Sequence, residues 1–308
     1  MSPNATTAAP AAAALAQIDE DPVFASRVEQ LIRLSRDRHV NSFAKIEWPG
    51  TVPEDAWWLS PELLSVHGTE YADALPERQL KLLSKWECIN AFSLNVEGER
   101  ELIALLSARL YAPDLPDIEA YIHHFIDEEN KHLWFFGEFC RRYGGKIYSS
   151  KKTGVADERF GHEMTFFLLF ARIFIFEEIG GYYNVVAGGD DRVSPFVRSI
   201  HQIHHADEAR HITFGRAVLS QSKEIAFAAS DEAEREAAIA HLQRFVQVSI
   251  EALYQPAMYR DSGIEGGVAL RRRLLQHPAR RAHHAEALLK RPLKFMAGLG
   301  IELEANPR

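Results

Sequence analysis

The feature that most constrains this chain is a glutamate and histidine pattern that occurs twice with nearly the same spacing. Each copy is a glutamate followed by a Glu-x-x-His unit: Glu97, Glu129 and His132 in the first, and Glu177, Glu208 and His211 in the second. The two glutamates of a copy are 32 residues apart in the first and 31 in the second. Residues three apart share one face of an α-helix, so each unit needs a helix to present both side chains together. The pattern therefore predicts two similar helix pairs.

Hydrophobic periodicity is helical along the whole chain, and strand-like alternation bounded by hairpin turns is hard to find. The expected helices cover about 22–40, 76–111, 118–143, 160–187, 195–223, 230–256, 264–276 and 279–298. Pro22 is a start signal for the first helix, and Gly144-Gly145 is a stop signal for the third. No change in composition marks a second domain. We expect a disordered tail over residues 1–20 and a single domain over 21–308.

Four helices of this kind would bring four carboxylates and two imidazoles into one core. This donor set is typical of di-iron and di-manganese carboxylate bundles. It contains no thiolate, so it suits iron or manganese better than a structural zinc. Two ferrous ions can together deliver the electrons that cleave dioxygen. The sequence thus predicts an all-α, ferritin-like bundle with additional peripheral helices, two iron ions (Fe2+/Fe3+) as cofactor and O2 as co-substrate.

One histidine goes beyond this pattern. In HHADEARH, His204 lies four residues before Glu208 and seven before His211, on the same helical stripe. From its position alone, His204 is either a core histidine that supports the ligands or a third imidazole ligand. We expect the second, with His204 bound to the same iron as His211 and Glu208 shared between the two metals. Neighbouring polar residues are expected to face elsewhere: His205, Asp207 and Arg210 on other sides of this helix, and Glu128 and Glu138 on the surface. Nearby aromatic residues should keep the site dry: Phe125, Trp134, Phe135, Phe170 and Phe174.

Periodicity leaves two ligand positions open. Glu99 rivals Glu97, because Glu99 falls in an apolar stripe whereas Glu97 shares a face with Trp86, Asn90 and Ser93. The stripe contains Phe92, Val96, Ile103, Leu106 and Leu110. Glu178 likewise rivals Glu177. Burying a glutamate on such an aromatic helix without a partner is costly, so at least one of Glu177 and Glu178 should meet a cation or a metal.

Charge and composition exclude other classes of protein. The 308 residues include 43 acidic and 35 basic side chains, a net charge of −8, which argues against nucleic acid as a partner. Two cysteines, Cys88 and Cys140, are too few for a disulfide framework and fit a reducing compartment. The most apolar run, 164–176, is interrupted by Arg172 and is too short to span a membrane. We expect a cytoplasmic protein without a membrane partner.

The ligand segments DEENKH and HHADEARH resemble those of the AurF-like di-iron oxygenases, the p-aminobenzoate N-oxygenase type, over roughly residues 38–215. The resemblance implies that His204 is a third imidazole ligand and that oxygen activated at two irons oxidises aryl amines toward nitro groups. In that family the first lone glutamate follows a Trp by eleven residues and an Asn by seven, which favours Glu97. The second lies 27 residues before the extra histidine, which favours Glu177. Phe92 occupies the position of a family arginine, so recognition of an aromatic carboxylate is not implied.

The expected function is therefore N-oxygenation of an amine, such as an aryl amine to a hydroxylamine or nitro product, in secondary metabolism. An alternative keeps the metals but changes the reaction to C-hydroxylation or desaturation of a small or carrier-bound substrate. A third class, ferritin-like iron storage or peroxide scavenging, is disfavoured because the chain has helices beyond a four-helix unit. Expected partners are a small-molecule substrate and an external electron donor, and a homodimer is allowed.

Overall fold

The computed structural model describes residues 15, 17–18, 21–111, 116–149 and 159–306. Most of the predicted tail over residues 1–20 lies outside these ranges. The α-helices are α2 (Pro22–Asp37), α3 (Ser42–Lys45), α4 (Glu70–Asp73), α5 (Glu77–Ser107), α6 (Pro116–Phe139), α7 (His162–Gly188), α8 (Pro195–Ala229), α9 (Glu232–Ala252), α10 (Pro256–Asp261), α11 (Gly267–Gln276), α12 (Pro278–His283) and α13 (Lys290–Gly298). A 3-10 turn, η1 (Pro61–Leu63), and two π-helical turns, η2 (Cys140–Gly144) and η3 (His284–Leu288), complete the helical elements.

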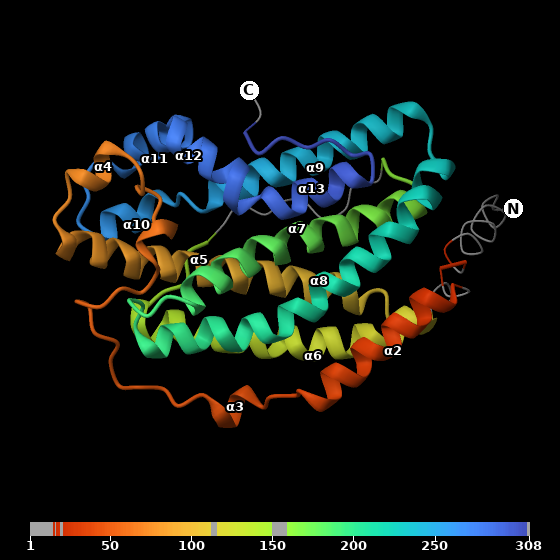
Figure 1. The fold of residues 1–308 in the computed structure, drawn as a ribbon, viewed down its shortest axis with the longest axis horizontal. Coiled ribbons are helices and arrows are strands. Elements are labelled where there is room, and N and C mark those ends of the chain that lie inside the picture. The colour runs from red at the N-terminus through yellow and green to blue at the C-terminus, as the bar shows by residue number, and fades with distance from the viewer. Residues whose placement is uncertain (1–14, 16, 19–20, 112–115, 150–158, 307–308) are drawn as a thin grey trace, which may run out of the picture.

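The predicted all-α, ferritin-like bundle with peripheral helices is confirmed. Its centre is formed by the four long helices α5 to α8, which run side by side (Figure 1). α5 packs mainly against α6, and α7 packs most extensively against α8. Within the described residues the only β-type pairing is an isolated bridge between Trp57 and Val193. None of the described helices combines the length and apolarity needed to cross a membrane.

The boundaries follow ordinary helix chemistry. Asp21 caps α2 through its side chain, which accepts a hydrogen bond from the backbone N–H of Val23 at 2.9 Å. Asp231 caps α9 in the same way, accepting from Glu234 N–H at 2.8 Å. After α6, η2 is followed by Gly145, whose φ of 66° is left-handed. The largest difference from the predicted ranges is α8, which continues to Ala229 instead of ending near 223.

The peripheral helices cover two sides of this bundle. α9 and α13 pack against α7, and α2 packs against α6 and α8. α4, α10, α11 and α12 gather at one end (Figure 1). α7 is buried on nearly every side, which explains its apolar sequence. Its fully buried members include Phe166, Phe167, Phe170, Phe174 and Ile175. The bundle core therefore lies in a dry, aromatic-rich environment.

Candidate metal centre

Seven buried side chains converge at the middle of the bundle and form two groups. Glu99, His132 and His204 make the first, and Glu129, Glu177, Glu208 and His211 make the second. Within each group, potential ligand atoms all lie within 4.8 Å of one another. All four core helices contribute: α5 supplies Glu99, α6 Glu129 and His132, α7 Glu177, and α8 the other three.

Two of the glutamates connect the groups. Glu129 Oε2 lies 3.4 Å from His132 Nδ1, while its Oε1 lies 2.7 Å from His211 Nδ1. Glu208 Oε1 lies 2.8 Å from His204 Nε2 and 3.3 Å from His132 Nδ1, and its Oε2 lies 3.6 Å from His211 Nδ1. Each carboxylate thus turns one oxygen to each group. This is the arrangement expected of carboxylates that bridge two metal ions.

Many buried polar atoms of the cluster have no hydrogen-bond partner among the described residues, and this shows whether a metal fits the site. Within the described part of the chain, both carboxylate oxygens of Glu99, Glu129 and Glu208, one oxygen of Glu177, and Nδ1 of His132 and His211 are buried without a hydrogen-bond partner. Buried polar atoms left unpaired in this number are costly. Cations bound to the oxygens and ring nitrogens would remove that cost. The oxygen and nitrogen donors, without a thiolate, fit iron.

The electrostatics of the cluster also indicate missing positive charge. Burial, with the neighbouring Glu129, raises the pKa of Glu99 well above its ordinary value. Burial also opposes ionisation of Glu129, but His211 and His132 outweigh it and lower the pKa of Glu129 to about 2. Burial and the nearby His132 hold the pKa of His204 well below its ordinary value. His204 is therefore neutral, the form in which an imidazole binds a metal.

The choice of Glu97 over Glu99 needs correction. Glu97 lies away from the cluster, with its side chain 22% exposed, and forms an ion pair with Arg100 at 2.6 Å. Glu99 is 1% exposed, and its Oε1 lies 3.6 Å from His204 Nε2. Two positions apart on a helix is about 200°, so only one of the two glutamates can face the bundle core. The apolar stripe containing Glu99 was the informative signal.

For the second open position, the structure places Glu177 in the cluster. The adjacent Glu178 is buried too, and forms an ion pair with Arg216.

The prediction that His204 and His211 bind the same iron does not agree with the geometry. His204 groups with His132, and His211 groups with Glu177. Seven residues of helix rise about 10 Å, and Glu208 lies between the two rings, so they face opposite ends of its carboxylate.

Asp207 and Glu128, which we expected to face away from the site, hold two of its histidines instead. His132 Nε2 is hydrogen-bonded to Asp207 Oδ2 at 3.0 Å, and His211 Nε2 to Glu128 Oε2 at 2.8 Å. Arg210 Nη2 bridges Glu128 Oε1 and Asp207 Oδ1, both at 2.5 Å. Asp207, Glu128 and Arg210 are all buried. Carboxylates bonded to the far nitrogen of a ligand histidine fix its ring and raise its basicity.

Each of the two helices α6 and α8 supplies the carboxylate that holds the ligand histidine of the other helix. Glu128 precedes Glu129 on α6 and holds His211 of α8, whereas Asp207 precedes Glu208 on α8 and holds His132 of α6. The sequence contained the signal, because an acidic residue precedes the glutamate in both Glu-x-x-His units. The repeat is therefore Asp/Glu-Glu-x-x-His.

The predicted aromatic surroundings are only partly found. Phe125 stacks on His211, with ring centroids 3.9 Å apart, and Phe135 lies 5.4 Å from His132. Phe136, not predicted, packs edge-on against His204 at 4.8 Å. Trp134 instead packs against Phe43, at a centroid distance of 4.5 Å, near the bundle surface. The rings that touch ligands keep water from the cluster.

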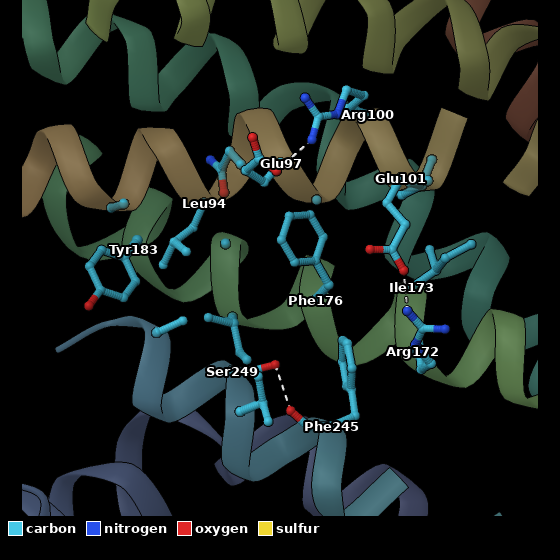
Figure 2. A pocket seen from close by; sticks show the side chains of 18 of the residues that line it. Leu94, Glu97, Arg100, Glu101, Arg172, Ile173, Phe176, Tyr183, Phe245 and Ser249 are labelled. Atoms are coloured by element: carbon cyan, nitrogen blue, oxygen red, sulfur yellow. Dashed lines mark hydrogen bonds and ion pairs between the residues drawn. The ribbon is translucent and has the colours of Figure 1, made fainter. Parts of the chain in front are cut away.

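A cavity of about 430 Å³ lies behind the cluster, between α5, α7 and α9 (Figure 2). Its wall includes Leu94, Ile173, Phe176, Ile179, Phe245, Asn184 and His201, and the ion-paired side chains of Glu97, Arg100, Glu101 and Arg172. No residue of the two metal-binding groups lines it. The cavity nevertheless reaches the back of the site, because a Cβ added to its wall residue Gly180 would lie 3.8 Å from His204 Cε1.

A helical bundle whose four central helices bring together carboxylates and imidazoles in this way defines the class of ferritin-like di-metal carboxylate proteins. The sequence matches the family model of the P-aminobenzoate N-oxygenase AurF over residues 22–299, and the chain belongs to that family. It is thus a di-iron N-oxygenase, as the sequence predicted. No curated protein matches the chain.

Proposed function

We propose that this protein oxidises the amino nitrogen of a small aromatic amine, with two iron ions held by Glu99, Glu129, His132, Glu177, His204, Glu208 and His211. The observation that carries the proposal is the pair of buried groups joined by Glu129 and Glu208, whose oxygens face both groups. Two irons bound there would supply the activation of dioxygen, with electrons from an external donor. The protein itself orients the ligands and keeps the site dry.

We propose further that the cavity between α5, α7 and α9 binds the amine. Its volume of about 430 Å³ falls within the usual range of about 300–1,000 Å³ for small-molecule sites. The wall is mainly apolar, which suits a benzenoid ring. Gly180, Asn184 and His201 place one end of the cavity directly behind His204.

The charges on the cavity wall favour a neutral substrate. Arg100 faces Glu97 at 2.6 Å, and Arg172 forms an ion pair with Glu101 (Figure 2). The positive charge of each arginine is therefore matched by a carboxylate. Phe92, also on the wall, adds an apolar ring. We infer that an aryl amine without a carboxylate binds better than p-aminobenzoate.

The test compares two amines of similar size. Iron-loaded protein is reduced, exposed to oxygen and supplied with p-toluidine, which is neutral, or with p-aminobenzoate, which is anionic. We expect hydroxylamine, nitroso or nitro products from p-toluidine by mass spectrometry, and less product from p-aminobenzoate. Ring- or methyl-hydroxylated products without N-oxidation would reject the proposal in favour of a C-hydroxylase. Higher turnover of p-aminobenzoate would reject the inferred charge preference.

We also propose that residues 21–308 act as one domain, since the family match runs from 22 to 299. A cytoplasmic location is supported by Cys88 and Cys140, which are both free and buried. Differential scanning calorimetry of the purified protein should show a single unfolding transition if the domain proposal is right.

A further inference from the structure

Asn184 of α7 lies between two buried histidines of α8. Its Nδ2 is 2.7 Å from Nδ1 of His204, and its Oδ1 is 3.0 Å from Nδ1 of His201. The exposed fractions of Asn184, His201 and His204 are 3%, 1% and 3%, so water does not compete for these bonds. His201 and Asn184 line the cavity, whereas His204 belongs to the candidate metal centre. The amide is thus a physical link between the two sites.

The positions of the amide atoms determine the ring tautomers. An amide NH2 can only donate, so Nδ1 of His204 accepts, and the ring hydrogen is on Nε2. That Nε2 lies 2.8 Å from Glu208 Oε1, although no hydrogen bond joins the two atoms. The amide oxygen can only accept, so Nδ1 of His201 carries the hydrogen of that ring, and Nε2 is left with its lone pair. The two hydrogen bonds of the Asn184 amide are therefore consistent with each other in a protein without metal.

A metal ion on His204 reverses each of these roles. A metal needs the lone pair of Nε2, so the ring hydrogen must be on Nδ1. Nδ1–H then requires an acceptor, and rotation of the amide by about 180° places Oδ1 there without changing the volume occupied. The NH2 group now faces Nδ1 of His201, which must accept, and the hydrogen of that ring is on Nε2.

We propose that Asn184 transmits metal binding at His204 to the cavity, by turning its amide and converting His201 Nε2 from an acceptor into a hydrogen-bond donor. The proposal rests on His204 being a metal ligand, as the proposed function states. Each imidazole keeps one hydrogen in both states, so no net proton is gained or lost. Burial lowers the pKa of His201 to about 3, which keeps the ring neutral throughout.

The converted atom is unpaired within the described part of the chain and belongs to a residue of the cavity wall. His201 Nε2 is buried and has no hydrogen-bond partner among the described residues, while Nδ1 is held by Asn184. The ring is also held by Phe92, at a centroid distance of 5.0 Å. The metal-loaded protein therefore offers a fixed donor to an acceptor in the cavity, such as the lone pair of an aryl amine nitrogen. In this account His201 is a substrate-positioning residue whose donor role depends on the metal.

The tautomers can be measured without any turnover. Protein labelled with 15N-histidine is examined by long-range 1H–15N NMR, first without metal and then with Zn(II) as a diamagnetic replacement for iron. We expect His201 to change from the Nδ1–H to the Nε2–H tautomer on Zn(II) addition, while His204 shows a metal-bound Nε2. His201→Gln identifies the His201 signals by their loss, and the exposed His205 is the internal control that should not change tautomer.

Asn184→Asp is the sharpest variant. A carboxylate accepts from both histidines, so His201 should stay in the Nδ1–H form with and without Zn(II). If His204 binds Zn(II) in the wild type and His201 keeps its tautomer, the link through Asn184 is wrong although the metal centre stands. If Zn(II) leaves His204 unchanged, the proposed ligand set is wrong and the link fails with it. Should the variant not fold, the wild-type comparison alone decides.

Discussion

At the scale of single residues, two histidines of the candidate centre are held from behind by carboxylates and the third by an amide. Asp207 holds His132, Glu128 holds His211, and an amide holds His204. The two carboxylates are in turn bridged by Arg210. A carboxylate strengthens the electron donation of an imidazole to a metal more than an amide does. The two metal positions therefore differ in their support as well as in their ligands.

Replacing Glu128 tests this support. Glu128→Gln keeps the size of the side chain but loses the charge that faces His211 and Arg210, so metal binding should weaken by about 10–100-fold. Titration with Fe(II) under anaerobic conditions measures the change. Glu138→Gln is the matched control, since Glu138 pairs with Arg142 at 2.5 Å and is partly exposed. Equal affinities in the two variants would show that Glu128 does not support a ligand.

The pair Glu97 and Glu99 gives a second prediction at this scale. Glu99→Gln should reduce the iron content below about two per chain, because it removes a charged ligand from the group with His132 and His204. Glu97→Gln should leave the iron content unchanged, since Glu97 faces Arg100. Metal analysis of both purified variants decides. Loss of iron in Glu97→Gln with retention in Glu99→Gln would restore the original choice.

These residues also mark the limit of prediction from sequence. The spacing of the repeat predicts the Glu-x-x-His units because helix geometry fixes which side chains share a face. It does not separate Glu97 from Glu99, because each lies on a plausible stripe until the neighbouring helices are in place. Glu128 is hard to predict for a related reason. An acidic residue beside a ligand normally faces water, and only packing against α8 gives it His211 and Arg210.

At the scale of elements, α5 and α7 approach each other closely beside the cavity. The approach depends on Gly98, because a Cβ there would lie far inside van der Waals contact with the Phe176 ring. Figure 2 shows this ring between α5 and α7. Both helices line the cavity, and each also supplies one glutamate to the candidate metal centre. Their spacing should therefore affect both packing and the shape of the cavity.

Gly98→Ala tests the contact. Alanine favours a helix over glycine by about 1 kcal/mol, but overpacking costs about 1–3 kcal/mol, so we expect a net loss of stability. Chemical denaturation measures the free energy of unfolding. Gly137→Ala on α6 is the control, because the nearest atom to its added Cβ is Val96 Cγ2 at 4.0 Å, and there alanine should stabilise. If both changes stabilise the protein, the Phe176 ring moves aside without a cost in free energy, and the expected overpacking at Gly98 is wrong.

The helix pattern itself was predictable to within a few residues over most of the chain. The main exception lies near the C-terminal end of the described residues. The expected helix at 279–298 is divided into α12, η3 and α13, with a π-helical turn over His284–Leu288. His284 is buried there and hydrogen-bonded to the Tyr254 hydroxyl at 2.7 Å. A tertiary contact of this kind has no local sequence signal.

At the scale of the whole molecule, the peripheral layer is joined to the bundle through another buried carboxyl group. Glu87 of α5 accepts a hydrogen bond from the backbone N–H of Ser65 at 2.9 Å and another from the Ser65 hydroxyl. The hydroxyl of Tyr259, on α10, donates to Ser65 Oγ at 3.0 Å. Burial raises the pKa of Glu87 to about 7. The junction should therefore make the stability of the protein depend on pH.

The direction in which the stability changes with pH follows from the raised pKa of Glu87. Between pH 4.5 and 7 the folded state keeps a proton on Glu87 that the unfolded state loses, so the free energy of unfolding falls as the pH rises through this range. Glu87→Gln removes this contribution. The free energy of unfolding of Glu87→Gln minus that of the wild type should therefore increase by about 3 kcal/mol from pH 4.5 to pH 8. A difference that does not change with pH would show that Glu87 has an ordinary pKa.

The central claim is that two metal ions lie in this bundle with Glu129 and Glu208 between them. Anomalous diffraction at the iron edge, from crystals of the iron-loaded protein, tests it most directly. We predict two iron peaks, one beside Glu99, His132 and His204 and the other beside Glu177 and His211, with both bridging carboxylates contacting each. A single peak, or a peak beside Glu97 in the cavity, would contradict the account.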